Sequence, residues 1–180
     1  MTIRQPKQAV QSKMNTVIFL DIDGVLNSKF WENDNQREIS ERKHVDSEMV
    51  KRFAAFVKKT NAYVVLHSGW RFWFDEQMNP IRLESELLVK TLNEAGITIY
   101  GKTPDLTTEE IRRTKKFSLV KADEIIMWLK ENPVDNWVVF DDLNLKNNII
   151  EKHQVRTNAD FGLTDKDIEK AYSLLGFDIK

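Results

Sequence analysis

The sequence predicts a fold of the α/β class, a three-layer arrangement in which helices cover both faces of a parallel sheet. Two observations lead to this prediction. Short apolar runs alternate along the chain with segments of helical periodicity, and polar side chains follow directly after the ends of the runs. The 180 residues contain no internal repeat and no low-complexity linker, which favours a single domain with one hydrophobic core.

The predicted strands are short and almost wholly apolar, as strands that are buried on both faces are. Branched and aromatic residues dominate them, for example in "TVIFL" and "WVVF". The expected strands span residues 16–20, 62–66, 97–100 and 137–140, and a further short strand is expected near residues 154–157.

The predicted helices show apolar residues that recur at every third or fourth position. They span residues 45–59, 82–94 and 119–130, and a final helix begins at residue 165. Gly96 is expected to end the second helix as a C-cap, and Pro133 follows the third. Thr164 is the expected N-cap of the final helix.

Three segments have a polar composition and no clear periodicity. Residues 27–44 and 101–117 are expected to be irregular, and residues 1–14 are expected to form a polar tail before a single domain at residues 15–180. The first irregular segment begins at the carboxyl end of the first strand, where open parallel sheets bind their ligands.

Composition excludes several classes of function. A formal net charge of −1 does not suit a protein that binds nucleic acid through its overall charge, although a local basic patch remains compatible with it. The chain has no cysteine, which excludes disulfides, thiolate metal sites and cysteine nucleophiles. The N-terminus lacks an apolar leader and no segment is long enough to span a membrane, so a cytoplasmic location is expected.

Reactive side chains follow the predicted strands at the points where they end. Because parallel strands place their carboxyl ends at one edge of a sheet, these side chains are expected to converge. From the first strand they are Asp21 and Asp23, from the second His67, Ser68, Gly69 and Arg71, and from the fourth Asp141 and Asp142, with Lys121 nearby at the start of a helix.

Clustered carboxylates without thiols or several histidines suit a hard, oxygen-seeking divalent cation, usually Mg²⁺. Such a cation would offset the mutual repulsion of the aspartates and leave one of them free to attack phosphorus. A second aspartate can protonate the leaving oxygen, and Ser68 and Lys121 can hold the phosphoryl oxygens.

The segments "VIFLDIDGVLN", "VVLHSGWR" and "WVVFDD", together with a lysine-bearing helix, resemble the four ordered motifs of the haloacid dehalogenase-like (HAD) superfamily. The resemblance implies a Rossmann-like sheet, with Asp21 as nucleophile and Asp23 as general acid and base. It implies that Ser68 and Lys121 bind the phosphoryl group. The metal set that it implies comprises Asp21, Asp142, Asp141 beside it, and Asp23 through its main-chain carbonyl.

Some assignments remain open at the level of sequence. Lys115 and Lys116 compete with Lys121 for the role of the phosphate-binding cation. Arg71 is expected either to clamp a substrate phosphate, together with Gly69 in the same loop, or to pair with a surface acid. His67 is expected to be a packed histidine rather than a catalytic one.

The resemblance also bears on the substrate. The predicted helices and strands use most of the chain between the motifs, so no full cap domain fits and the site is expected to be open. The pattern is similar to the small HAD domains of bacterial and phage RNA-repair proteins and to the phosphatase half of phage polynucleotide kinase-phosphatases. This similarity implies removal of 3′-phosphates from nucleic-acid ends or nucleotides, with a small-metabolite phosphatase or a non-catalytic binding module as alternatives.

Two surface features bear on the same question. The basic run "RRTKK", residues 112–116, is either a phosphate-tracking patch or a solvated loop. An aromatic cluster either stacks bases or covers the core; its members are Phe30, Trp31, Trp70, Phe72, Trp73 and Phe74.

Overall fold

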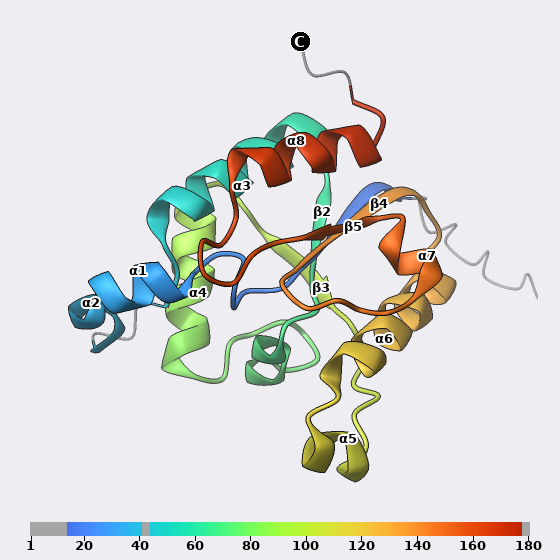
Figure 1. Ribbon diagram of the computed structural model, residues 1–180, viewed down its shortest axis with the longest axis horizontal. Helices are drawn as coiled ribbons and strands as arrows, with labels where there is room; N and C mark the ends of the chain where they lie inside the picture. Colours follow the sequence, from blue (N-terminus) through green and yellow to red (C-terminus); the bar gives the residue numbers. More distant parts are fainter. Residues whose placement is uncertain (1–13, 41–43, 178–180) are drawn as a thin grey trace, which may run out of the picture.

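The computed structural model describes residues 14–40 and 44–177, so the predicted N-terminal tail lies almost wholly outside the described residues. A five-stranded parallel sheet forms the centre of the molecule in the order β3-β2-β1-β4-β5 (Figure 1). The strands are β1 (Met14–Leu20), β2 (Tyr63–Leu66), β3 (Ile99–Lys102), β4 (Val134–Asp141) and β5 (Gln154–Arg156). The predicted α/β fold is therefore confirmed.

The register of the sheet decides where the site lies. Leu20 at the end of the central strand β1 pairs with Leu66 of β2 on one side and with Phe140 of β4 on the other. Because the three strands end level with one another, the residues that follow them emerge at one edge of the sheet. The last four residues of β1, Val17 to Leu20, are fully buried on both faces of the sheet, as a central parallel strand requires.

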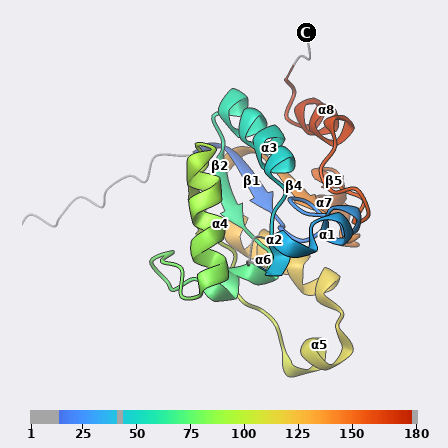
Figure 2. The same cartoon turned by 90° about the vertical axis from the view of Figure 1, so that its left-hand side faces the viewer.

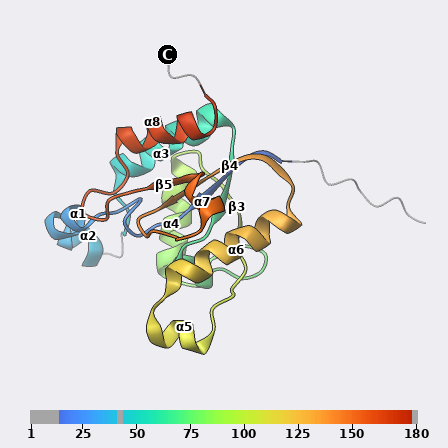
Figure 3. The same ribbon diagram turned by 45° about the vertical axis from the view of Figure 1, so that its right-hand side comes forward.

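Helices cover the two faces of the sheet with separate apolar clusters (Figures 2 and 3). Helices α3 (Ser47–Thr60), α4 (Leu83–Glu94) and α8 (Asp165–Leu174) pack on one face. Helices α6 (Phe117–Glu131) and α7 (Asn148–Glu151) pack on the other, where Trp128 meets Phe19 edge-on at 5.3 Å. The sheet therefore lies between two helical layers, as the sequence predicts.

The predicted strand bounds shift most in β3 and β4, while β1 begins two residues earlier and β2 one residue later than predicted. Strand β3 begins at Ile99 rather than at residue 97, because the Ile97 amide still donates to Leu92 in the turn that ends α4. Gly96 lies in this turn with φ of +81°, which confirms it as the residue that ends the helix. Strand β4 begins earlier than predicted, at Val134, because its first residues pair with the start of β1.

The two segments that were expected to be irregular contain short helices, so that prediction is wrong in part. The first holds α1 (Lys29–Asp34) and α2 (Gln36–Ser40), and the second holds α5 (Glu109–Thr114) after the end of β3. The side chains of Ser28 and Thr108 cap α1 and α5. In Figure 1 both segments stand out from the body at the edges of the molecule, and neither forms a full cap domain. Within the described part of the chain, no helix is long and apolar enough to cross a membrane.

Candidate active site

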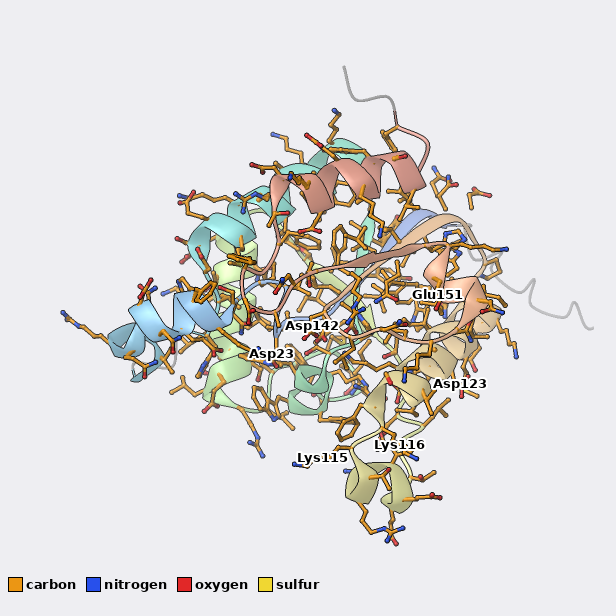
Figure 4. The ribbon with its side chains drawn as sticks, viewed as in Figure 1. Asp23, Lys115, Lys116, Asp123, Asp142 and Glu151 are labelled. Atoms are coloured by element: carbon orange, nitrogen blue, oxygen red, sulfur yellow. The ribbon has the colours of Figure 1, made fainter. Side chains whose placement is uncertain are left out.

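The ends of strands β1, β2 and β4 bring the predicted site residues together. Backbone hydrogen bonds lock these ends to one another, with the Asp21 amide donating to Phe140 at 3.0 Å and the His67 amide to Leu20 at 3.1 Å. Asp23 and Asp142 consequently lie close together near the centre of Figure 4, although they come from different strands. Asp21, Asp23, Lys121 and Asp142 all line one cavity of about 400 Å³.

Lys121 is the lysine that reaches the acidic cluster. Its Nζ lies 2.5 Å from Asp21 Oδ2 and 2.6 Å from Asp141 Oδ2, and the side chain is buried. Lys115 and Lys116 are exposed at the junction of α5 and α6, away from Asp23 and Asp142 in Figure 4. Of the three lysines that the sequence left open, the geometry therefore selects Lys121.

Lys121, Asp21 and Asp141 shift one another's pKa values. Burial works against the charge of each group, but the attraction of Lys121 keeps the pKa of Asp21 below its usual value. Burial raises the pKa of Asp141 to about 7, and repulsion from Asp21 adds to the rise. The two carboxylates raise the pKa of Lys121 in spite of its burial. Asp21 and Lys121 are thus the charged pair at neutral pH, and Asp141 is the first of the two acids to take a proton.

Asp23 is oriented by two donors that the sequence did not suggest. The Asn27 side-chain amide donates to Asp23 Oδ1 at 3.0 Å, and the Trp70 indole donates to Asp23 Oδ2 at 3.0 Å. Asn27 in turn accepts a hydrogen bond from the Gly24 amide at 2.8 Å, so the turn after β1 is closed upon itself. These bonds hold the second carboxylate apart from the first, in the partly open position that a proton carrier needs.

Gly24 allows the turn after β1 to approach the end of β4. It has φ of +73°, and a β-carbon at this position would lie 2.8 Å from the Cβ and Cγ atoms of Asp142. Thr157 fixes the same turn by donating its hydroxyl to the Gly24 carbonyl at 2.7 Å. Glycine is required here both for its backbone conformation and for the space that Asp142 occupies.

His67 and Ser68 lie beneath the carboxylates and are fully buried. His67 Nε2 lies 3.3 Å from the Phe140 carbonyl and 3.4 Å from Asp141 Oδ2. Burial is the main cause that lowers the pKa of His67 to about 3, and Lys121 lowers it further. His67 is therefore a neutral packed histidine, as expected. The Ser68 hydroxyl lies within hydrogen-bonding reach of Asp21 and helps to lower the pKa of that acid.

Arg71 is held by a buried acid rather than presented freely to the cavity. Its Nη2 donates to Glu124 Oε1 at 2.7 Å and its Nη1 to the Ser68 carbonyl at 3.0 Å. Glu124 Oε1 also accepts from the Leu106 amide at 3.0 Å. Arg71 thus pairs with an acid, but that acid is the buried Glu124 and not a surface acid as expected, and Gly69 and Arg71 still line the cavity.

The acidic cluster fits a divalent cation. Asp21, Asp141 and Asp142 each place a carboxylate oxygen within 4.8 Å of the others, and all of these donors are hard oxygens. With Asp23 the site holds four carboxylates against the single ammonium of Lys121, and burial together with repulsion from Asp21 also raises the pKa of Asp142. The two oxygens of Asp141 accept hydrogen bonds from Lys121 and from the Leu143 amide, and those of Asp21 accept from Lys121 and from the Ile22 amide.

The members of the aromatic cluster lie in different surroundings, and Trp31 is half-buried on α1. Trp70 and Phe74 are buried, and Trp73 packs against Trp70 with ring centroids 4.6 Å apart, so these rings cover the core. Phe30 is exposed on α1, where it contacts Phe161. Phe72 is the member that lines the cavity above Asp21 and Asp23.

Haloacid dehalogenase-like (HAD) hydrolases are the class of protein that this parallel sheet and its acidic edge define. Residues 17–168 match the family described as "HAD domain in Swiss Army Knife RNA repair proteins", and the chain therefore belongs to that family. The similarity to RNA-repair HAD domains that the motifs indicate is thereby confirmed. No curated protein and no solved structure gives a significant match.

Proposed function

We propose that this chain is a Mg²⁺-dependent phosphomonoesterase that forms an aspartyl-phosphate at Asp21. The observation that carries the proposal is the pairing of two unlike carboxylates at one cavity. Asp21 is buried and kept ionised by Lys121, whereas Asp23 is more exposed and oriented by Asn27 and Trp70. Two acids held in such different surroundings suit two different roles, nucleophile and proton carrier.

In the proposed first step, a carboxylate oxygen of Asp21 attacks the phosphorus of the monoester. A bond forms between Asp21 and phosphorus, the bond from phosphorus to the leaving alcohol breaks, and Asp23 gives its proton to that leaving oxygen. In the second step Asp23 takes a proton from a water molecule, whose oxygen bonds to phosphorus. Inorganic phosphate then leaves with the oxygen of that water, and the Asp21 carboxylate is restored.

The chain's own groups stabilise the negative charge that moves during these steps. Lys121 and the Ser68 hydroxyl lie against Asp21, where they can bind the phosphoryl oxygens of a substrate. Asp21 and Asp142, and Asp23 through its main-chain carbonyl, would hold the Mg²⁺. When bound, the cation would neutralise the charge of the incoming phosphate.

The substrate that we propose is a phosphorylated nucleic-acid end or a nucleotide, and a 3′-phosphate in particular. The family to which the chain belongs is described by its occurrence in RNA-repair proteins. The open cavity, without a full cap domain over it, suits the end of a long substrate better than a small one that needs to be enclosed.

The test is phosphate release with and without Mg²⁺ from a panel of monoesters. The panel holds an aryl phosphate, nucleoside 3′- and 5′-monophosphates, a 3′-phosphorylated oligonucleotide and sugar phosphates. Asp21→Asn is expected to abolish release, because an amide is a poor nucleophile and a poor Mg²⁺ ligand. Asp123→Asn is the matched control, since Asp123 is exposed on α6 and lies away from Asp23 and Asp142 in Figure 4.

Each outcome has a defined meaning. Release that needs Mg²⁺, persists in Asp123→Asn and disappears in Asp21→Asn supports the mechanism, and the best substrate identifies the class. Faster turnover of sugar phosphates than of any nucleotide would replace the nucleic-acid substrate by a small metabolite. Comparable release by Asp21→Asn and the unaltered chain would show that Asp21 is not the nucleophile.

A further inference from the structure

Three apolar side chains that line the catalytic cavity take no part in the proposed chemistry. They are Phe72 from the turn after β2, Phe117 from the start of α6 and Leu143 from the loop after β4. These three side chains remain 44%, 39% and 37% exposed, although large apolar groups are usually buried. Exposed rings beside a polar catalytic centre suit a ligand that has a flat, weakly polar part next to its phosphate.

Arg112 on α5 lines the same cavity and carries a charge that is only weakly compensated. Its Nη2 lies 3.3 Å from Asp105 Oδ2, and the two side chains are 59% and 39% exposed. An exposed ion pair of this kind is weak, so an anionic ligand can take the place of Asp105. The planar guanidinium suits a phosphate group, to which it can donate two parallel hydrogen bonds.

The other basic side chains of this cavity are already committed. Lys121 is bound by Asp21 and Asp141, and Arg71 by the buried carboxylate of Glu124. Among the described residues that line the cavity, Arg112 is therefore the cation best able to accept a second anion. It lies on α5, which stands out from the body beside the start of α6 (Figures 1 and 3).

We propose that Phe72, Phe117 and Arg112 form a leaving-group site that selects the substrate. The two rings flank a nucleobase, and Arg112 binds a second phosphate of the same substrate, beyond the one that is hydrolysed. The preferred substrate is thus a nucleoside that carries a phosphate at both its 3′ and its 5′ position. The 3′-phosphorylated end of an oligonucleotide and a nucleoside 3′,5′-bisphosphate both meet this requirement. This inference rests on the proposed phosphatase function, which it deepens.

The first test compares a nucleoside 3′-monophosphate with the corresponding 3′,5′-bisphosphate, and phenyl phosphate serves as a substrate without a second anion. In the unaltered chain the second phosphate is expected to raise kcat/KM about tenfold or more, because this is the factor that the free energy of one charge-assisted hydrogen bond corresponds to. Arg112→Ala should lose this gain and leave phenyl phosphate turnover unchanged. The matched control is Arg113→Ala, the exposed neighbour on α5 that is not among the cavity's lining residues.

The second test removes a ring. Phe117→Ala is expected to lower kcat/KM for both nucleotides several-fold while turnover of an alkyl phosphate stays the same, because loss of base stacking affects only substrates with a base. Phe161→Ala is its control, since Phe161 is also exposed but pairs with Phe30 near α1. Equal losses for nucleotide and alkyl esters would overturn the stacking role of Phe117.

Binding separates a failure of this inference from a failure of the proposed function. The affinity for a nucleoside 3′,5′-bisphosphate can be measured by calorimetry in Asp21→Asn and in the same variant with Arg112→Ala. About tenfold weaker binding in the double variant supports the site even where no turnover occurs. Equal affinities, or the same change on Arg113→Ala, would overturn it, whatever the activity assays show.

Discussion

The buried pair of Arg71 and Glu124 offers the sharpest test of how the site is held together. Glu124 is fully buried, and its Oε1 accepts hydrogen bonds from Arg71 at 2.7 Å and from the Leu106 amide at 3.0 Å. This one side chain therefore ties α6, which carries Lys121, to the turn after β2 and to the loop after β3. Glu124→Ala would leave the buried Arg71 guanidinium without its carboxylate partner, with the Ser68 carbonyl as its remaining acceptor, and would remove the acceptor of the Leu106 amide.

The expected cost follows from burial. Removing one partner of a buried ion pair usually costs about 3 to 5 kcal/mol, because the charge that remains is uncompensated. Burial raises the pKa of Glu124 more than Arg71 lowers it, so the intact ion pair adds little net stability. Removal of only one of the two side chains is nevertheless strongly destabilising. The free energy of unfolding of a domain of this size is about 5 to 15 kcal/mol, so Glu124→Ala is expected to remain folded but to lose a large part of this stability.

The assay is unfolding in guanidinium chloride, followed by tryptophan fluorescence. Asp123→Ala is the control, because Asp123 is the exposed neighbour on the same helix and is expected to change stability by less than about 0.5 kcal/mol. Replacing both Arg71 and Glu124 by methionine should recover much of the loss, since the buried charge is removed with its partner. A loss below about 1 kcal/mol in Glu124→Ala, or a double variant no more stable than it, would refute this reasoning.

Two further predictions concern the turn after β1 and the histidine beneath the site. Gly176→Ala should cost about 1 to 2 kcal/mol because its φ is +71°, and Gly24→Ala should cost more, because its φ is +73° and its β-carbon would also lie 2.8 Å from the Cβ and Cγ atoms of Asp142. Only Gly24→Ala should weaken activation by Mg²⁺, because its β-carbon would displace Asp142; equal Mg²⁺ titrations would contradict this. Burial lowers the pKa of His67 from 6.5 to about 3, so its contribution to stability is complete above pH 6.5 and is lost as the pH falls toward 3. Between pH 7 and pH 5 the unaltered chain is expected to lose about 2 kcal/mol of its free energy of unfolding through this histidine. His67→Gln should not show this loss, and urea unfolding of both proteins at the two pH values measures the difference.

Sequence patterns are sufficient to predict the parallel sheet and most of the residues of the site. Strands β1, β2 and β4 are recognisable because buried parallel strands leave nearly continuous apolar runs, and the polar residues after them mark their ends. Since parallel strands end at one edge, Asp21, Asp23, Asp141 and Asp142 are expected together without any knowledge of distances. The bounds of the edge strand β3 are less certain, because only one neighbour fixes its pairing.

The short helices α1, α2 and α5 escape prediction for a different reason. They have five or six residues each, too few for periodicity to be read, and such short helices depend on caps and on neighbouring structure. Ser28 and Thr108 are visible afterwards as N-caps, but serine and threonine are common in loops as well. The sequence places Arg112 in a basic run that is either a phosphate-tracking patch or a solvated loop, and Phe117 at the end of a polar segment, whereas the structure brings both side chains to the cavity.

The sequence by itself determined the fold class, the acidic edge and the family, because strand order and motif order are properties of the chain. Only the tertiary structure decided how side chains are directed at that edge. The successive residues Trp70, Arg71 and Phe72 lie in a 3₁₀ turn, in which neighbouring side chains point about a third of a turn apart. Trp70 therefore reaches Asp23, Arg71 reaches Glu124, and Phe72 lines the cavity. Likewise, Lys121 reaches Asp21 from the second turn of α6, whose apolar face packs against the sheet, whereas Lys115 and Lys116 precede this helix and are exposed; this difference follows from how α6 packs and not from any local pattern of residues.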